Sequence, residues 1–473
     1  MKMLLADKWV DRETTIDVRD PYDGSVIDTV PAASAEDIET ALAAAVRGFE
    51  IAKDMTSYER ATVLRDTADS VERNAEQFAE TIAREGSKTI REARKEVSRC
   101  INVLNVSADA SKQLVGETIR FDSFPGGENR LGYYERVPVG VIAAITPFND
   151  PLNLVAHKLG PAVAAGNAVV LKPATSTPLS ALKLVETFVE CGLPPLVVQA
   201  ITGEARDMGD QLIADERVRM ISFTGGVDTG KMITRKAGLK KLGMELGSNS
   251  PVIVWNDANV AWAAETCVSG AFWAAGQNCI GVQRLYVHDD VYDEFRDRFV
   301  ALTSEYKLGS KLDDATDMGP LIDEAAAARV ESRIRQAADL GASILTGGTR
   351  DGTSIPPTVL ENVPETAEIH REEIFGPTVN LYRVSDLDDA LAKANSLPFG
   401  VHAGLFTRDV ETAFYASRRL DCGGVMINDS TDYRLDAMPF GGVKDSGLGR
   451  EGVRFSLHEM TEPKVVCFHL AQR

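Results

Sequence analysis

The chain has 473 residues, of which 44% are hydrophobic and 26% are charged. At roughly 100–200 residues per domain, this length predicts two to four domains, and the composition excludes widespread disorder. Seventy acidic residues against 51 basic ones give a formal net charge of −19. Such a surface repels polyphosphate backbones, and the basic clusters are pairs such as Lys240-Lys241. We therefore expect no nucleic-acid partner.

Membrane, secretory and metal-binding signals are missing from the sequence. No run approaches the roughly 18 apolar residues of a membrane helix. The N-terminus carries Lys2 and Asp7 where a secretory signal would be apolar, so we expect a cytoplasmic protein with no membrane partner. The six cysteines are scattered and match no metal-binding spacing. They predict neither a metal site nor a disulfide framework, as is usual in a reducing compartment.

The first 110 residues predict helices after a short strand region. The sequence Ser34-Ala35-Glu36-Asp37 is typical of a helix start, and Thr56-x-x-Glu59 is a capping box. Apolar side chains then recur three and four apart from Val63 to Ile82, which predicts one amphipathic helix ending near Gly86.

From about residue 139, short apolar runs alternate with helical stretches. Runs that are apolar throughout predict strands buried on both faces, as in the parallel sheet of a doubly wound α/β fold. The expected strands are Val141–Ile145, Ala168–Leu171, Val197–Ile201, Met220–Phe223 and Leu242–Leu246. A second α/β domain is predicted by later runs at Pro251–Trp255, Arg284–Val287, Ser343–Leu345, Thr378–Val384 and Gly424–Asn428, with an apolar helix over Val260–Ala275.

Two segments are predicted to be peripheral. One is a hairpin around Thr118–Val137, and the other is the terminal run Lys464–Leu470. Both either pair with another subunit or form ordinary edge strands.

Polar motifs stand where the predicted strands end, which is where ligands bind in such sheets. Asn149 follows the first strand, and Lys172 and Thr175 follow the second. Phe223-Thr224-Gly225-Gly226 gives a turn whose N–H groups can approach a pyrophosphate. Glu245 ends the fifth strand among apolar residues and glycine, where its pKa is expected to be raised, as suits a general base. Taken singly, each motif is more typical of an ordinary turn, cap or ion pair than of a ligand site.

Cys279 follows Ala275-Gly276-Gln277-Asn278, a small and polar stretch that can expose a thiol. A thiolate with a lowered pKa is a strong nucleophile. For any one of six cysteines the alternative is an inert, buried thiol, which we expect for Cys267 in the preceding helix.

Together these motifs resemble the aldehyde dehydrogenase superfamily, whose members oxidise aldehydes to acids with NAD(P). The resemblance runs through nearly the whole chain. It is carried by Thr146-Pro147-Phe148-Asn149, Lys172-Pro173-Ala174, Phe223-Thr224-Gly225, Glu245-Leu246-Gly247, Gly276-Gln277-Asn278-Cys279, Glu372-Glu373-Ile374-Phe375-Gly376-Pro377 and Pro439-Phe440-Gly441-Gly442-Val443-Lys444-x-Ser446-Gly447.

The resemblance implies roles for particular residues. Cys279 would be the nucleophile, Glu245 the general base and Asn149 an oxyanion donor. The residues that would bind NAD or NADP are Thr146, Pro147, Phe148, Lys172, Ala174, Thr175, Phe223, Thr224, Gly225, Gly226, Thr229, Leu246, Glu373 and Phe375.

The resemblance also implies the architecture. A Rossmann-type NAD(P)-binding domain would comprise residues 1–117 and 139–245, and an α/β catalytic domain residues 246–427. Segments 118–138 and 455–473 would form a small β oligomerisation arm, giving a homodimer or homotetramer.

Two departures from the family pattern bear on the cofactor and the site. Gly225-Gly226 stands where many members have Gly-Ser, and Gly247-Ser248-Asn249 where many have Gly-Gly-Lys. Thr175 replaces the glutamate of many NAD-preferring members, which removes repulsion of a 2′-phosphate. NADP is therefore plausible, and NAD is not excluded.

The substrate is predicted from two segments, Asn149–Lys158 and Asn428–Phe440, that resemble the microbial lactaldehyde dehydrogenase-like branch. Relatives there accept short hydroxylated or anionic aldehydes. Arg434 could bind a substrate anion, or else form a surface ion pair with Asp432 or Asp436. His157 could bond a substrate hydroxyl, or else be a buried structural histidine.

A hydrolytic aldehyde dehydrogenase has three alternatives: another acyl acceptor, another substrate, and a protein without catalytic activity. A CoA-acylating enzyme commonly lacks the glutamate found at Glu245, and a succinate-semialdehyde-type substrate is a further alternative. A non-catalytic binding or structural protein on this fold would not need Cys279, Glu245 and Asn149 together.

Overall fold

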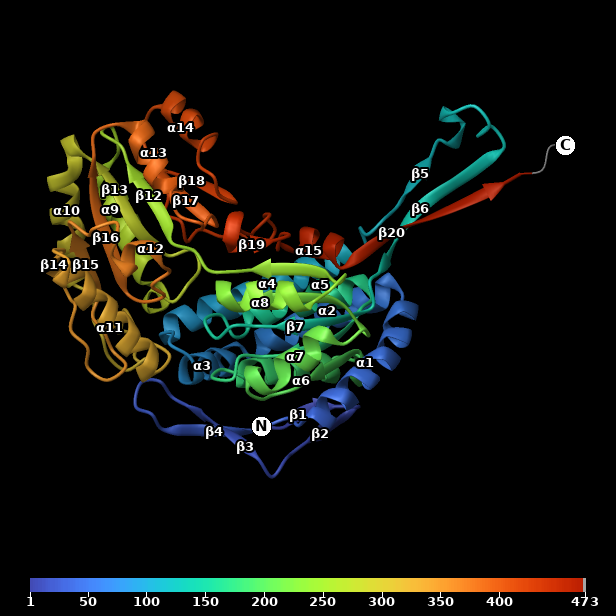
Figure 1. Ribbon diagram of the computed structural model, residues 1–473. Helices are drawn as coiled ribbons and strands as arrows, with labels where there is room; N and C mark the ends of the chain where they lie inside the picture. Colours follow the sequence, from blue (N-terminus) through green and yellow to red (C-terminus); the bar gives the residue numbers. More distant parts are fainter. Residues whose placement is uncertain (471–473) are drawn as a thin grey trace.

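The computed structural model describes residues 1–470, apart from the side chains of residues 205–207. Two sheet-centred lobes face each other, and a narrow β arm projects away from both (Figure 1). The chain forms two strands of the arm partway through the first lobe, crosses to the second lobe, and returns to the first before its last strand completes the arm.

The first lobe is built on an eight-stranded sheet in the order β19-β11-β10-β7-β8-β9-β1-β2. Its five central strands are parallel, and their bounds match the five predicted apolar runs to within two residues at each end. The strands are β1 (Met3–Leu5), β2 (Lys8–Val10), β7 (Val141–Ile145), β8 (Ala168–Lys172), β9 (Val198–Ala200), β10 (Val218–Thr224), β11 (Lys241–Glu245) and β19 (Gly447–Leu448).

Helices cover both faces of this sheet. Ile142 and Ala144 of β7 belong to a core with α2 to α6, whereas Val141 and Ala143 pack with α1, α7 and α8. This alternation explains why the strands are apolar throughout, as a doubly wound sheet requires. The helices are α1 (Ala35–Asp54), α2 (Ser57–Arg73), α3 (Ala75–Glu85), α4 (Ile90–Ser111), α5 (Asn153–Ala165), α6 (Leu179–Glu190), α7 (Ala205–Ala214) and α8 (Val227–Lys236).

The predicted helix starts are confirmed, but one predicted helix is two. Ser34 and Thr56 both form capping boxes. The single amphipathic helix expected up to Gly86 is wrong, because α2 ends and α3 begins at Asn74, whose φ and ψ of −111° and 21° are not helical. The Asn74 amide donates to the Ser70 carbonyl at 2.8 Å and so competes with the helical pattern. Apolar periodicity continues across the break and hides it from sequence.

The second lobe holds a seven-stranded sheet in the order β14-β15-β16-β13-β12-β17-β18. All its pairings are parallel except β14 with β15. Its strands are β12 (Ser250–Val254), β13 (Val282–His288), β14 (Ser343–Thr346), β15 (Thr358–Glu361), β16 (Thr378–Val384), β17 (His402–Phe406) and β18 (Gly424–Ile427). Its helices are α9 (Val260–Phe272), α10 (Asp289–Ser304), α11 (Glu324–Asp339), α12 (Glu368–Arg371), α13 (Leu387–Asn395) and α14 (Val410–Ser417). The predicted second α/β unit is thus present, with β15 and β17 in addition to the strands expected.

The arm is a three-stranded antiparallel sheet of β5 (Glu117–Ile119), β6 (Arg130–Pro138) and β20 (Thr461–His469). The predicted hairpin and terminal run are therefore neighbours in space, and both outer strands keep a free edge (Figure 1). A separate hairpin joins β3 (Thr15–Arg19) to β4 (Val26–Pro31).

Segment 447–460 joins the first lobe just before the arm. Strand β19 pairs with β11, and helix α15 (Val453–Glu459) buries Val453 and Leu457 in the core of α4 and α5. Within residues 1–470, no helix combines the length and apolar character needed to cross a membrane.

Candidate active site

A cleft of about 1430 Å³ opens at the carboxyl ends of β7, β8, β10 and β11. The chain winds from β7 to β8 on one side and returns to β10 on the other, so the cleft lies at the point where the winding direction changes. Of the predicted site residues, only His157 is absent from its walls. Lining the cleft are Thr146, Pro147, Phe148, Asn149, Lys172, Ala174, Thr175, Phe223, Thr224, Gly225, Gly226, Thr229, Glu245, Leu246, Cys279, Glu373, Phe375 and Arg434.

Cys279 reaches the cleft on a tight turn after α9. Ala274, Ala275 and Gly276 have φ values of 51°, 55° and 68°, and a Cβ on Gly276 would lie 2.2 Å from the Gly376 carbonyl oxygen. Gly276 is therefore required by close backbone approach as well as by its dihedral angle. Cys279 is half-buried, whereas Cys100 and Cys267 are buried in helices. Burial raises the pKa of the Cys279 thiol, and the Glu373 carboxylate adds to this effect.

Glu245 is buried at the end of β11. Its backbone carbonyl accepts from the Gly225 N–H at 3.0 Å, and its Oε1 faces Gly441, where a Cβ would lie 2.9 Å away. Burial, reinforced by the nearby Glu451 carboxylate, raises the pKa of Glu245 well above its usual range. The expectation of a raised pKa, drawn from the apolar sequence around Glu245, agrees with this environment.

A buried ion-pair cluster that the sequence did not predict stands beside Glu245. Glu451 accepts from the Lys158 ammonium at 3.1 Å and from Arg434 Nη2 at 3.1 Å. Burial alone would raise the pKa of Glu451, but these two cations hold it at about 2. Glu451 therefore stays charged in the wall of the cleft.

Arg434 does not form the surface ion pair with Asp432 or Asp436 that was its structural alternative. Its side chain is 7% exposed, pairs with Glu451, and lies 3.7 Å above the Phe440 ring. Its Nε is buried with no hydrogen-bond partner among the described residues. Arg434 is thus a buried guanidinium with an unused donor at a wall of the cleft.

Arg99 of α4 is a further cleft residue that the sequence did not indicate. Its Nη2 donates to Asp436 at 2.9 Å, and its buried Nε has no partner among the described residues. The available signal was the recurrence of charged residues at Glu92, Glu96 and Arg99 on one face of the helix.

His157 lies behind the cleft. It is 1% exposed, and its Nε2 is 3.2 Å from the Asp436 carboxylate. Burial and the Arg434 charge lower the pKa of His157. The structure fits the alternative of a buried structural histidine, because His157 does not line the cleft.

The end of the cleft that is predicted to bind the adenosine ribose of NAD(P) is formed by β8 and the loop after it. Lys172 Nζ donates to Thr175 Oγ1 at 3.3 Å, and Thr175 Oγ1 donates to the Gly203 carbonyl at 3.0 Å. Burial lowers the pKa of Lys172 to about 8. A hydroxyl and an amine that are both near the surface of the cleft can bond ribose oxygens or a 2′-phosphate.

Gly226 is the N-cap of α8, so free N–H groups of this helix face the cleft near Gly225 and Thr229. A helix N-terminus of this kind favours phosphate groups. Phe223 lies below the turn, where a Cβ on Gly225 would come within 2.6 Å of its ring. Gly225 is therefore required for the turn to pass over that ring.

Glu373 and Phe375 enter the cleft from the second lobe. The Ser248 N–H donates to Glu373 Oε1 at 2.8 Å, and a Cβ on Gly247 would lie 2.2 Å from Glu373 Oε2. Burial raises the pKa of Glu373 to about 7. The Phe375 ring meets Phe148 edge to face, with centroids 5.6 Å apart.

Asn249, one of the departures from the family pattern noted above, has a structural role. Its amide donates to the carbonyls of His370 and Glu372, at 3.1 and 2.9 Å. Asn249 thereby holds the backbone that carries Glu373.

Comparison with known proteins assigns this fold and site to a family. Residues 9–466 match the aldehyde dehydrogenase family, and the chain belongs to it. It is 50% identical to aspartate-semialdehyde dehydrogenase 1 of Pseudomonas canavaninivorans, over 97% of each chain. It is 42% identical to 3-sulfolactaldehyde dehydrogenase of Priestia aryabhattai, over 98% of this chain and 97% of that one. The resemblance inferred from the motifs is confirmed.

A solved structure gives the same assignment. The NADP-dependent glyceraldehyde-3-phosphate dehydrogenase of Bacillus halodurans, crystallised with NADP, superposes with a TM-score of 0.97 at 37% identity over 99% of each chain. The predicted fold class is confirmed, and the protein is an NAD(P)-dependent oxidoreductase of the aldehyde dehydrogenase family.

Proposed function

We propose that this enzyme oxidises a short aldehyde carrying an anionic group to its carboxylic acid, through a Cys279 thioester that water hydrolyses. One observation carries the proposal. A half-buried cysteine, a buried glutamate of raised pKa and two guanidinium groups with unpartnered Nε atoms line the same cleft.

The chemistry follows from the residues in this cleft. The Cys279 sulfur, once deprotonated, adds to the aldehyde carbon to give a thiohemiacetal. The Asn149 amide and a backbone N–H would stabilise the negative charge that develops on the aldehyde oxygen. NAD(P), when bound, supplies the acceptor for the hydride that leaves this carbon. A thioester on Cys279 remains.

Glu245 would then act as the general base that activates water against the thioester. Its raised pKa suits this role, because it makes the deprotonated carboxylate a stronger acceptor for a proton from water. The presence of Glu245 also favours hydrolysis over transfer to CoA. A binding protein on this fold would have no use for a buried carboxylate beside a cysteine.

Substrate selection is assigned to Arg434 and Arg99. Each lines the cleft, and each has a buried Nε with no partner among the described residues. A guanidinium matches the planar fork of a carboxylate, sulfonate or phosphate. The three similar proteins named above all carry the names of dehydrogenases for anionic aldehydes. A hydroxyl on the substrate is compatible with this cleft.

The cofactor site fits NADP as well as NAD. Lys172 and Thr175 present an amine and a hydroxyl, and neither residue repels a 2′-phosphate. Gly225, Gly226 and the start of α8 would hold the pyrophosphate, with Glu373 and Phe375 toward the nicotinamide ribose. The remaining predicted contacts, Thr146, Pro147, Phe148, Ala174, Phe223, Thr224, Thr229 and Leu246, line the same cleft.

The domain boundaries and the oligomer are proposed on the same basis. Residues 1–117 with 139–245 form the cofactor-binding domain, and residues 246–427 the catalytic domain. The free edges of β5 and β20, together with exposed Leu131, Val465 and Phe468, support pairing of the arm in a homodimer or homotetramer.

The test is a panel of aldehydes assayed by absorbance of the reduced cofactor, separately with NAD and NADP. The panel comprises aspartate semialdehyde, succinic semialdehyde, 3-sulfolactaldehyde, a phosphonoaldehyde, glyceraldehyde 3-phosphate, lactaldehyde and propanal. We expect kcat/KM to be highest for an anionic member. Equal kcat/KM for propanal and all anionic aldehydes would refute the anionic-substrate proposal. Activity that requires added CoA would refute hydrolysis.

A further inference from the structure

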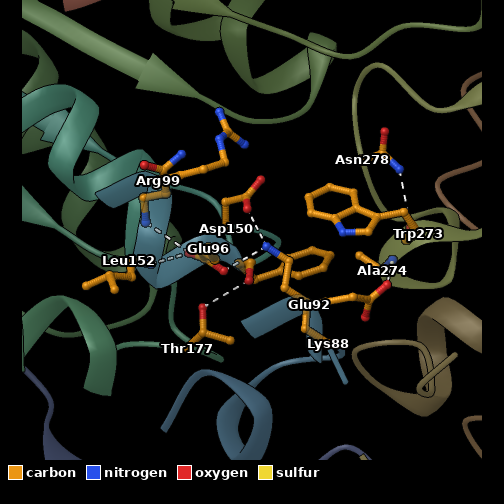
Figure 2. Close-up of polar contacts among 12 residues, drawn as sticks. Lys88, Glu92, Glu96, Arg99, Asp150, Leu152, Thr177, Trp273, Ala274 and Asn278 are labelled. Carbon is orange, nitrogen blue, oxygen red and sulfur yellow. Dashed lines mark hydrogen bonds and ion pairs between the residues drawn. The ribbon is translucent and has the colours of Figure 1, made fainter. Parts of the chain in front are cut away.

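The start of α4 and the residues just before it contact both the segment of Asp150 and Leu152 and the turn of Trp273 and Ala274 (Figure 2). In the chain, the first of these segments follows Asn149 and the second leads to Cys279. Glu92 and Glu96 lie four residues apart on one side of the helix, and Lys88 precedes the N-cap residue Thr89, with its side chain reaching Glu96. None of the three takes part in the chemistry proposed above. All three are buried.

Lys88 is the centre of this cluster. Its side chain is 2% exposed, and its Nζ donates to Glu96 Oε2 at 2.7 Å and to the Asp150 carboxylate. The same ammonium lies 4.5 Å from the centroid of the Trp273 ring. Figure 2 shows the amine between these three groups, which come from different parts of the chain.

The loop that carries Asn149 is held at two points after this residue. Asp150 follows Asn149 directly and is fixed by Lys88. The second oxygen of Glu96 accepts from the Leu152 and Asn153 N–H groups at 2.8 and 2.9 Å, at the start of α5. The backbone after Asn149 therefore cannot shift without breaking contacts to α4.

The loop that carries Cys279 is held from the same helix. The Ala274 N–H donates to Glu92 Oε1 at 2.8 Å, at the residue where φ becomes positive. Asn278, next to Cys279, donates from its amide to the Trp273 carbonyl at 3.3 Å. The Trp273 ring that Lys88 contacts thus belongs to the same turn that places Cys279.

We propose that Lys88 is a positioning residue for the reaction, because its ammonium fixes the Asn149 loop and the Cys279 turn relative to each other. The inference rests on the proposed function, in which Asn149 supplies the oxyanion donor and Cys279 the nucleophile. A neutral side chain at position 88 would leave the Glu96 and Asp150 carboxylates without the ammonium that joins them. The two loops would then separate.

Two variants test this role. Lys88→Met removes the ammonium, and Asp150→Ala removes only the link to the Asn149 loop while leaving the Lys88–Glu96 pair intact. Asp150→Ala keeps one positive and one negative charge in the Lys88–Glu96 pair. If Lys88→Met does not fold, Asp150→Ala alone tests whether the link from Lys88 positions the Asn149 loop. Asp37→Ala is the matched control, since Asp37 is a buried carboxylate paired with Arg12 and does not line the cleft.

The measurements are the single-turnover rate of hydride transfer, the Kd of NADP and the Tm. We expect hydride transfer to fall about 10- to 100-fold in Lys88→Met and Asp150→Ala, because misplacement of a reacting group by about 1 Å costs on that order. The Kd of NADP should change less than about threefold in each variant. Asp37→Ala should lower the Tm and leave hydride transfer unchanged. A loss of hydride transfer in the control that equals the loss in the test variants would overturn the proposal.

A double-mutant cycle with Asn149→Ala separates positioning from general destabilisation. If Lys88 acts through Asn149, Asn149→Ala with Asp150→Ala should be no slower than Asn149→Ala alone. Additive losses would overturn the role of Lys88 while leaving the proposed function intact. A wild-type rate in Asn149→Ala alone would instead refute the oxyanion role in the proposed function, and the inference that depends on it.

Discussion

Arg434 Nη2 donates to Glu451 Oε2 at 3.1 Å inside the wall of the catalytic cleft. Glu451 is in turn close enough to Glu245 for its charge to raise the pKa of that residue. A substrate anion that bonds Arg434 would therefore compete with Glu451 for the positive charge of the guanidinium. This contact connects substrate recognition to the residue proposed as the general base.

Replacement of Arg434 should change substrate preference. Hydrogen bonds to charged groups contribute about 1.5–3 kcal/mol, so Arg434→Ala should lower the kcat/KM ratio of an anionic aldehyde to propanal roughly 10- to 150-fold. Arg434→Lys should recover part of this ratio, because an ammonium cannot reproduce the fork. The measurement is kcat/KM for both aldehydes with each variant. An unchanged ratio would show that Arg434 serves only the ion pair with Glu451.

Replacement of Glu451 should shift the pH profile. The Glu451 charge raises the pKa of Glu245, while Lys158 and Arg434 lower it. Glu451→Gln removes the like charge and frees both cations to act on Glu245, so the pKa of Glu245 should fall. A base works in its deprotonated form, so the acid limb of the thioester hydrolysis rate should move to lower pH. A limb that stays in place or moves upward would contradict this coupling.

Replacement of the nucleophile should separate binding from chemistry. Cys279→Ala should abolish turnover, because only sulfur forms the thiohemiacetal, and it should leave cofactor binding largely intact. Turnover and the Kd of NADP measured on the same preparation check this. Appreciable steady-state activity in Cys279→Ala would exclude Cys279 as the nucleophile.

Replacement of the base should stop the reaction halfway. Glu245→Gln should allow the first hydride transfer and stall the release of acid, since the amide cannot take a proton from water. Stopped-flow absorbance should show a burst of reduced cofactor approaching one equivalent per active site, followed by slow turnover. The absence of a burst, with full steady-state turnover, would contradict the role.

Replacement of Thr175 should change cofactor choice. A carboxylate at this position repels a 2′-phosphate and can accept a bond from a 2′-hydroxyl. Thr175→Glu should therefore lower kcat/KM for NADP more than for NAD. The ratio of kcat/KM for the two cofactors is the readout, and Ser176→Ala in the same loop is the control. If Thr175→Glu leaves the ratio unchanged, Thr175 does not face the adenosine ribose.

The sequence by itself determined the two α/β units, the five central strands of the first sheet and a set of site residues that, except for His157, all line the cleft. Buried parallel strands are apolar throughout, and the capping boxes at Ser34 and Thr56 join residues three apart. Both features therefore depend only on residues that are close in sequence. The cleft residues follow because parallel strands present their carboxyl ends at one edge. A polar motif after each strand must then converge with the others.

The tertiary structure alone decided which partner each buried charge finds. Lys158 and Glu451 are separated by 293 residues, and nothing in either local sequence indicates their contact. The burial of His157, the pairing of Arg434 and the link from Lys88 to Asp150 depend in the same way on how helices and loops pack together. A buried charge must be compensated wherever the fold leaves it, so its partner is set by three-dimensional proximity, which local sequence patterns do not record.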